Sequence, residues 1–349
     1  MSQPRFNATL SAIEAKEHVV KIRRLRHRWP ENRIQKLFDT KLAPHRHQDF
    51  RTRRVEKPNG ATRVTYVATV EDQAMAYVVK PAWDQAWLTQ GHGHEFGLGV
   101  GQGREAAIRN LVQYLEQRME VDSTVLMTDI ESFYDTVPRV DPEDVGVGET
   151  HGDQLRAMFK AFDKVAPRTG VGVPQGSPLS PNLANLSLNK WVTSPFRKAY
   201  EGNLVQVYAD DVCMVTGSQH KAGRMLGDWN SRLGRVGMKV AEQKTEIIPI
   251  RLGASFNYLG VEIRVKESSF TVGIPERAFR SVAGKLSQAS TSEKFRQIRD
   301  GWLCSLSIIN EVEDQQRALE LIKSCQELAG IQHPCLAPPA WRQDAAAIW

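Results

Sequence analysis

The chain has 349 residues, enough for one large domain with subdomains or for two domains. Its 41% hydrophobic and 25% charged residues are typical of an ordinary soluble globular protein, and the absence of any apolar run near 18 residues argues against a membrane-spanning protein. The net charge of +6 favours a polyanionic partner no more strongly than it favours a basic protein without one.

The cysteine pattern argues against a zinc site. None of the cysteines forms a CxxC pair, which structural zinc sites commonly use. Because the sequence carries no signal peptide, we expect reduced thiols and a cytoplasmic location. The cysteines are Cys213, Cys304, Cys325 and Cys335.

The first 50 residues are basic, with a helical pattern. The run KIRRLRHRWPENRIQK holds much of the excess positive charge. Such a run can bind phosphate, or it can be a solvated helix face. We favour nucleic-acid binding, and the candidate residues are Arg23, Arg24, Arg26 and Arg28.

Residues 51–68 alternate on both sides of a Lys-Pro-Asn-Gly turn, which predicts a β-hairpin with Lys57 and Arg63 as cations on it.

Residues 71–88 are predicted to form a helix. The glycine-rich stretch that follows fits neither GxxxxGK[ST] nor GxGxxG, so a flexible loop leading into a helix from about Arg104 is favoured over a nucleotide P-loop. Two histidines in that loop, His92 and His94, are taken as ordinary loop residues, with a metal site as the alternative.

The second half of the chain alternates strands and helices. Residues 124–137 predict an apolar strand ending in Asp129 and then a helix start. Residues 170–192 predict a Gly/Pro-rich loop in their first half and a helix in their second half. The pattern also predicts strands at 205–209, 212–216, 244–251 and 255–265, and helices at about 219–237 and over 275–330.

Aspartate residues lie at the end of one predicted strand and on the turn of a predicted hairpin. Asp129 closes one strand, and Asp210 and Asp211 lie on the turn of a hairpin. If these strands are neighbours in one sheet, the three side chains converge. Close carboxylates repel one another unless a cation pairs them, and hard oxygen ligands suit Mg²⁺. The alternative is three unrelated surface aspartates.

These aspartates belong to a series of motifs that resembles the bacterial kind of reverse transcriptase, related to group II intron, retron and phage-defence enzymes. PQGSPLSP together with YADD, in this order and spacing, is highly specific. The resemblance covers about residues 50–265. Its pieces, in the family's order, are KPNGATR, FGLGVGQGREAA, MTDIESFYDTV, GVPQGSPLSPNLANLSLN, VYADDVCMV, LGRVGMKVAEQKTEII and FNYLGVEI.

The resemblance implies an α+β right-hand polymerase with fingers, a ferredoxin-like palm and a helical thumb. The implied division is a basic N-terminal region at 1–50 and fingers at 51–120. The palm then covers 121–265, with a fingers insertion at about 140–175, and the thumb and tail cover 266–349. About 85 residues after the last motif leave room for a thumb, but not for a nuclease or a long maturase region.

The family's site residues carry over by motif. Asp129, Asp210 and Asp211 are implied as catalytic residues and, with Ile130, as ligands of two Mg²⁺ ions, with Mn²⁺ as an alternative. An aromatic at Tyr134, with Phe133 as a competitor, would press on the sugar and favour deoxynucleotides. The remaining implied roles are incoming-nucleotide contacts for Lys57, Arg63, Gln175, Gly176 and Lys244, the primer grip for Tyr258, Leu259 and Gly260, and a nucleic-acid contact for Arg104.

The implied reaction is DNA synthesis on an RNA template, so the expected partners are RNA, a DNA primer and product, and dNTPs, without a membrane. A compact enzyme without a mobility nuclease favours a dedicated non-coding RNA in antiviral defence. Alternatives are a group II intron-like or retron-type enzyme, a catalytically silent RNA-binding scaffold, and an RNA-dependent RNA polymerase. A homo-oligomer or an accessory protein is left open.

Overall fold

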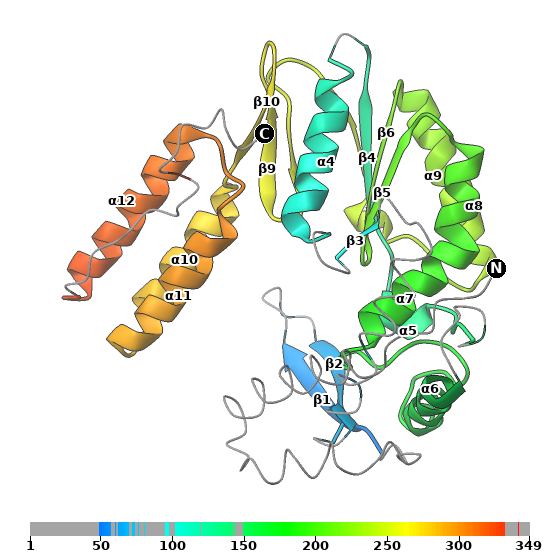
Figure 1. Ribbon diagram of the computed structural model, residues 1–349. Helices are drawn as coiled ribbons and strands as arrows, with labels where there is room; N and C mark the ends of the chain where they lie inside the picture. The colour runs from blue at the N-terminus through cyan, green and yellow to red at the C-terminus, as the bar shows by residue number, and fades with distance from the viewer. Residues whose placement is uncertain are drawn as a thin grey trace, which may run out of the picture. The chain divides into compact units, whose positions relative to one another are not determined.

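The computed structural model describes most of the chain after residue 48, and Figure 1 draws its elements. Nearly all of the basic segment 1–50 and most of the helix expected at 71–88 lie outside the described residues. The described residues are 49–56, 60, 62–69, 72–73, 76, 80, 95–97, 102–119, 121–141, 143, 149–331 and 341. Within them, no helix has the length and apolar character needed to cross a bilayer.

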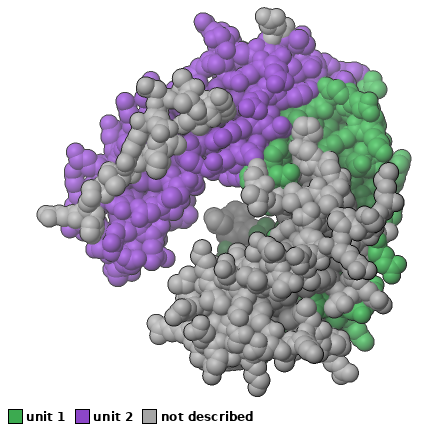
Figure 2. Space-filling model, viewed as in Figure 1, with its two compact units in different colours: residues 1–103, 127–213, 224–245 green, residues 104–126, 214–223, 246–349 purple. Residues whose placement is uncertain are grey.

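The chain divides into two compact units, which Figure 2 colours separately. The division falls within two strands, β4 (Thr124–Asp129) and β6 (Asp211–Thr216), and it does not follow the expected fingers, palm and thumb. That four-part organisation therefore stays a prediction. Unit 1 comprises residues 1–103, 127–213 and 224–245, and unit 2 comprises residues 104–126, 214–223 and 246–349.

A five-stranded sheet in the order β3-β5-β6-β4-β7 carries the predicted aspartates (Figure 1). Strands β4 to β6 are almost entirely buried, which explains their continuous apolar sequences. The strands expected at 205–209 and 212–216 are confirmed within one residue. The other members are β3 (Glu95–Phe96), which runs parallel to β5 (Leu204–Tyr208), and β7 (Glu246–Pro249).

Helices pack an aromatic core in unit 1. A π-helical turn, Asn189–Thr193, joins two of them into one continuous rod. The rings of Phe196 and Trp229 meet edge to face at 5.1 Å, and both side chains are fully buried. The helices are α5 (Phe133–Thr136), α6 (Glu149–Phe162), α7 (Ser180–Leu188), α8 (Ser194–Ala199) and most of α9 (Gln219–Arg235).

Replacing Trp229 with alanine is expected to lower the free energy of unfolding by about 3–5 kcal/mol, because a large buried ring leaves a cavity that close-packed neighbours cannot fill. Denaturant or thermal unfolding measures the loss. Trp191→Ala is the matched control, since Trp191 is 48% exposed and its removal is expected to change stability by about 0.5 kcal/mol or less. Equal losses in the two variants would contradict this assignment of the core.

The predicted hairpin at 51–68 is confirmed as β1 (Arg51–Glu56) paired antiparallel with β2 (Thr62–Val67). Most of its side chains are exposed. Tyr66 is the exception, because it is buried with its ring edge against Phe162 at 4.8 Å. This contact anchors the hairpin to α6 within unit 1.

Unit 2 combines a three-stranded sheet with helices. The sheet has the order β10-β9-β8, and α4 (Arg104–Glu116) contacts β10. The predicted helical region 275–330 is confirmed as three helices that share a core including Leu286, Phe295 and Ile322. The elements are β8 (Ser255–Tyr258), β9 (Val261–Val265), β10 (Phe270–Gly273), α10 (Glu276–Ser287), α11 (Ser292–Ser305) and α12 (Val312–Leu328).

Among the described residues, four elements had no counterpart in the sequence prediction: α6, α8, β10 and β3, which lies in the stretch predicted to be a flexible loop. For α6 a signal was available, since Leu155, Met158 and Phe162 recur at helical spacing and all are buried. Strand β10 has only four residues and α8 only six. Such short elements are stabilised by their neighbours more than by a pattern of their own.

Candidate active site

The turn between β5 and β6 brings the predicted aspartates together. Ala209 adopts a positive φ of 54°, which turns the chain sharply ahead of Asp210 and Asp211. The backbone N–H of Ile130 donates to the Asp210 carbonyl at 3.0 Å. Since Ile130 directly follows Asp129, this hydrogen bond places the end of β4 beside the turn, all within unit 1.

Asp210 and Asp211 lie close enough to neighbouring carboxylates for their ionisation to be affected. Burial raises the pKa of Asp210, and the negative charge of Asp129 raises it further. The Asp211 side chain still reaches solvent, but the surrounding protein removes much of its hydration, and with the charges of Asp210 and Asp129 this raises its pKa to about 6. The cluster therefore carries an excess of negative charge that favours a bound cation.

Lys244 supplies part of the positive charge that this acidic cluster favours. Its Nζ donates to Asp129 Oδ2 at 2.6 Å, and this hydrogen bond is the main reason that the pKa of Lys244 is raised. The chain reaches this position because the Ala241 N–H donates to the Asp129 carbonyl at 2.8 Å, just before the 3₁₀ turn Glu242–Lys244. The expected phosphate ligand thus forms an ion pair with a predicted metal ligand.

The donor set of this cluster fits a hard divalent cation. Its side-chain donors are carboxylate oxygens, the ligands that Mg²⁺ and Mn²⁺ take. Within the described part of the chain, however, no three or more His, Cys, Asp or Glu side chains are arranged as a ready metal-binding group. The contact between Lys244 and Asp129 gives a physical reason, because one carboxylate is already directed at an ammonium group.

Tyr134 lies beside the aspartates on the short helix α5. Burial and the negative charge of Asp210 raise the pKa of Tyr134 to about 12, while the positive charge of Arg63 opposes this rise. Arg63 also acts on the carboxyl groups of Asp135 and Asp210. Phe133 is buried at 3% exposure, whereas Tyr134 is half-buried, so the tyrosine ring is the more accessible of the two.

The glycine-rich loop packs directly against α5. The Val173 N–H donates to the Tyr134 carbonyl at 2.7 Å. Gly172 has a φ of 75°, and a Cβ there would lie 2.9 Å from the carbonyl oxygens of both Tyr134 and Asp135. Only glycine fits such a close backbone approach.

The same loop continues to Gln175 and Gly176, which contact the β-hairpin. The Tyr66 N–H donates to the Gln175 carbonyl at 2.8 Å. Gly176 has a φ of 117°, and a Cβ there would meet the Tyr66 carbonyl oxygen at 2.9 Å. Gln175 and Gly176 are thereby held against Tyr66 of β2, the strand that also carries Arg63.

An ion pair that sequence reasoning missed holds the glycine-rich loop in place. Arg139 Nη2 and Nη1 donate to the two Asp163 carboxylate oxygens at 2.7 and 3.0 Å. Arg139 also donates through Nε to the Gly172 carbonyl at 2.9 Å and stacks over Phe159 at 4.4 Å. The Arg139 side chain is only 12% exposed, and a bidentate, partly buried pair of this kind is stronger than a surface pair.

This pair predicts a pH effect on stability. The hydrogen bond from Arg139 holds the pKa of Asp163 below its ordinary value of 3.8, so the folded state binds the proton less readily than the unfolded chain. Its stabilisation is present above that value and is lost as the pH falls through the lower folded-state pKa. Unfolding measured from about pH 6 to about pH 3 should therefore show a smaller acid loss in Asp163→Asn than in the unchanged protein. The same acid loss in both would contradict the prediction.

The predicted primer-grip residues lie in unit 2, on the turn between β8 and β9. Tyr258 is buried at 4% exposure, and Leu259 and Gly260 form the turn. Arg104, predicted to contact nucleic acid, donates from Nε to the Leu259 carbonyl at 2.6 Å. Predicted residues outside the described part of the chain are Arg23, Arg24, Arg26, Arg28, Lys57, His92 and His94.

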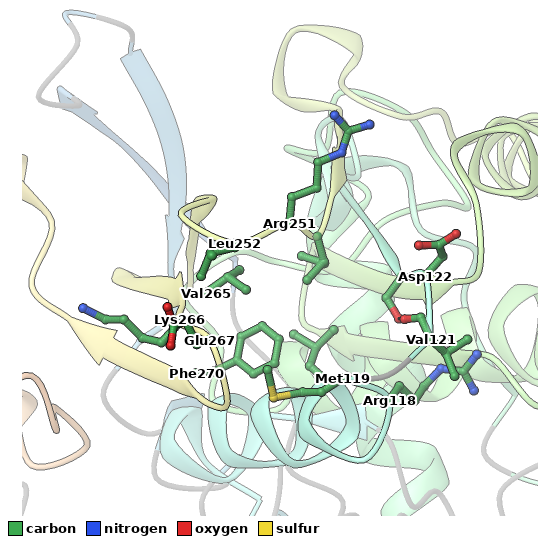
Figure 3. A pocket seen from close by; sticks show the side chains of 13 residues that line it. Arg118, Met119, Val121, Asp122, Arg251, Leu252, Val265, Lys266, Glu267 and Phe270 are labelled. Atoms are coloured by element: carbon green, nitrogen blue, oxygen red, sulfur yellow. The ribbon is translucent and has the colours of Figure 1, made fainter.

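A pocket of about 280 Å³ in unit 2 is separate from these residues (Figure 3). In it, Met119 and Phe270 point toward one another, whereas Arg251 and Lys266 extend away from them. Its lining includes none of the three aspartates, so it does not form part of the candidate site.

Comparison with known proteins identifies the fold and the family. Residues 55–263 match the family described as reverse transcriptase (RNA-dependent DNA polymerase). A telomerase from Candida albicans, solved with a TWJ fragment of telomeric RNA, is similar at a TM-score of 0.52 and 12% identity, over 87% of this chain and 59% of that one. An apo telomerase from Candida tropicalis, truncated from its C-terminal domain, gives 0.49 and 14% over 65% and 55%.

The chain thus spans a little over half the length of these telomerase chains. No curated protein matches it significantly by sequence. The predicted right-hand polymerase fold is confirmed, and the family match supports the predicted class of enzyme, an RNA-directed DNA polymerase, which is a nucleotidyltransferase. The family match covers more than half of the chain, and the chain therefore belongs to the reverse transcriptase family.

Proposed function

We propose that this reverse transcriptase synthesises DNA at the cluster of Asp129, Asp210 and Asp211. The observation that carries the proposal is the hydrogen bond from the Ile130 N–H to the Asp210 carbonyl, which joins the two acidic motifs in one place. In the reaction, the primer 3′-hydroxyl forms a bond to the α-phosphate of a dNTP. The bond from that phosphorus to the bridging oxygen breaks, and pyrophosphate leaves.

The three aspartates, with the Ile130 carbonyl, would hold two Mg²⁺ ions, and Mn²⁺ is an alternative. When bound, such ions neutralise the charge that develops on the attacking and leaving oxygens. The raised pKa values of Asp210 and Asp211 support this assignment, because the cluster is short of positive charge. We propose that Lys244, whose Nζ pairs with Asp129, would turn to the phosphates of a bound nucleotide.

The residues around the cluster would bind the incoming nucleotide. Arg63 would supply positive charge for the triphosphate, and Lys57, which lies outside the described residues, stays the second cation predicted from the sequence. Tyr134 presents a half-buried ring near Asp210, where it would crowd the 2′-hydroxyl of a ribonucleotide. Gln175 and Gly176 would lie beside the incoming nucleotide, fixed by the backbone contacts with Tyr66.

The proposed partners are an RNA template, a DNA primer and product, and dNTPs. The motif PQGSPLSP, with its Gln and Pro intact, argues against the error-prone diversity-generating type of reverse transcriptase. We propose a dedicated non-coding RNA as template, a role in antiviral defence and a cytoplasmic location. A group II intron-like or retron-type enzyme is the alternative, and the identity of the bound RNA separates them.

The test of the polymerase is primer extension on an RNA template with dNTPs or NTPs and Mg²⁺. The unchanged protein is expected to extend with dNTPs, and Asp210→Ala/Asp211→Ala is expected to be inactive. Preference for NTPs would favour an RNA-dependent RNA polymerase. If both proteins bind RNA but neither synthesises a nucleic acid, the result would favour a catalytically silent RNA-binding scaffold.

The test of the biological role is purification from the native host, followed by sequencing of the bound nucleic acid. One dominant non-coding RNA, with complementary DNA only when the aspartates are intact, is the expected result. Intron RNA as the dominant species would instead favour the mobile-element alternative.

A further inference from the structure

Arg104 connects two distant parts of unit 2 through one guanidinium group. It is the first residue of α4, and its Nε donates to the Leu259 carbonyl at 2.6 Å. Its Nη1 donates to the Ser305 carbonyl at 2.7 Å. Arg104 thus bonds at the same time to the β8–β9 turn and to the end of α11.

The β8–β9 turn needs such external support. Leu259 and Gly260 both have positive φ values, 45° and 81°, while Tyr258 and Val261 pair on either side. Two-residue hairpin turns with positive φ at both positions favour Asn-Gly, and a leucine side chain disfavours the left-handed region. The hydrogen bond from Arg104 holds the carbonyl of this strained residue.

The contact at α11 also has a physical reason. The last carbonyls of a helix lack partners within the helix, and positive charge is favourable at that end. Ser305 is the last residue of α11, so the Arg104 guanidinium caps it. The neighbouring Glu105 accepts a hydrogen bond from the Ser307 hydroxyl, which ties the start of α4 to the same segment.

We propose that Arg104 is a positioning residue, which holds the β8–β9 turn in its strained conformation and couples this turn to α11. The proposal deepens the proposed function, because it rests on that turn contacting the primer strand. Two of the guanidinium nitrogens are directed at backbone carbonyls within the protein. The role therefore differs from the direct nucleic-acid contact that the motif predicts for Arg104.

The test combines Arg104 variants with a second change that removes the strain. Arg104→Ala is expected to raise the KM for primer–template by about tenfold, through the loss of two charge-assisted hydrogen bonds, and to leave the KM for dNTP unchanged. Adding Leu259→Gly is expected to restore much of the loss, because glycine adopts positive φ without strain. Arg104→Lys keeps the charge but not the paired geometry, and it is therefore expected to raise the KM for primer–template nearly as much as Arg104→Ala does. Arg109→Ala on the same helix, whose guanidinium pairs with Glu105 at 3.9 Å, is the control for loss of charge.

Two results would overturn the proposal. One is a raised KM for primer–template in Arg104→Ala that Leu259→Gly does not lower, together with a nearly unchanged KM in Arg104→Lys. The other is a weaker salt dependence of primer–template affinity in Arg104→Ala, with a loss of slope that corresponds to about one phosphate contact. Such a loss is expected when a direct phosphate ligand is removed.

Hydrogen exchange separates this proposal from the proposed function. Amides in residues 255–265 are expected to exchange faster in Arg104→Ala than in the unchanged protein, whether or not DNA synthesis is observed. Unchanged exchange would refute the structural role of Arg104. Faster exchange in a protein that synthesises no DNA would instead refute the proposed function alone.

Discussion

Asp210→Asn is expected to reduce the rate of DNA synthesis by about a thousandfold or more, because it removes one of the charges that would hold the ions at the reacting oxygens. Single-turnover primer extension on RNA measures the loss. Asparagine keeps the size of the side chain, so the loss reports on charge. The same loss is expected for Asp129→Asn.

The stability of Asp210→Asn is expected to move in the opposite direction. The raised pKa of Asp210 means that its ionised form is less favourable in the folded protein than in the unfolded chain. Near neutral pH and without metal, the variant should therefore melt at or above the temperature of the unchanged protein. A large loss of stability together with the loss of activity would contradict this account.

Asp228→Asn is the matched control for these substitutions. Asp228 lies on α9, where it pairs with Arg232 at 3.0 Å and is 30% exposed. Removing this carboxylate is expected to leave the rate of DNA synthesis within about twofold of the unchanged protein, because surface pairs contribute little. A comparable loss of activity in Asp228→Asn would mean that the effect of Asp210→Asn reflects general charge rather than its place in the cluster.

Tyr134→Ala is expected to lower the preference for dNTPs over NTPs by about a hundredfold, because the pocket then accepts a 2′-hydroxyl that the ring excludes. The ratio of kcat/KM for a dNTP and its matching NTP measures the change. Tyr134→Phe is expected to keep the preference. The pKa of about 12 keeps the tyrosine protonated in the assay, so its ring and not its charge is the relevant feature.

Phe133→Leu tests the neighbouring aromatic residue. Since Phe133 is buried at 3% exposure, its replacement is expected to lower stability without changing the preference for dNTPs. A loss of preference in Phe133→Leu, with none in Tyr134→Ala, would transfer the selecting role to Phe133.

Local sequence features were sufficient for the main strands and for the three aspartates. Strands β4 to β6 are mostly apolar runs with an acidic residue at or near one end, and the sequence of the hairpin at 51–68 has Asn-Gly at its turn. Such periodicity and turn chemistry act between residues that are near in sequence. The order and spacing of the motifs then indicated the family, which the match over residues 55–263 confirms.

Only the tertiary structure revealed the contacts that support the aspartate cluster and its glycine-rich loop in unit 1 and, separately, the β8–β9 turn in unit 2. Arg139 and Asp163 are 24 residues apart, Lys244 and Asp129 are 115 apart, and Arg104 and Leu259 are 155 apart. No periodic pattern links an arginine to a carbonyl at such separations, because the fold alone brings them together. Sequence by itself pointed to the three carboxylates proposed to do the chemistry, and the tertiary structure decided which cations lie against them and against the loops around them.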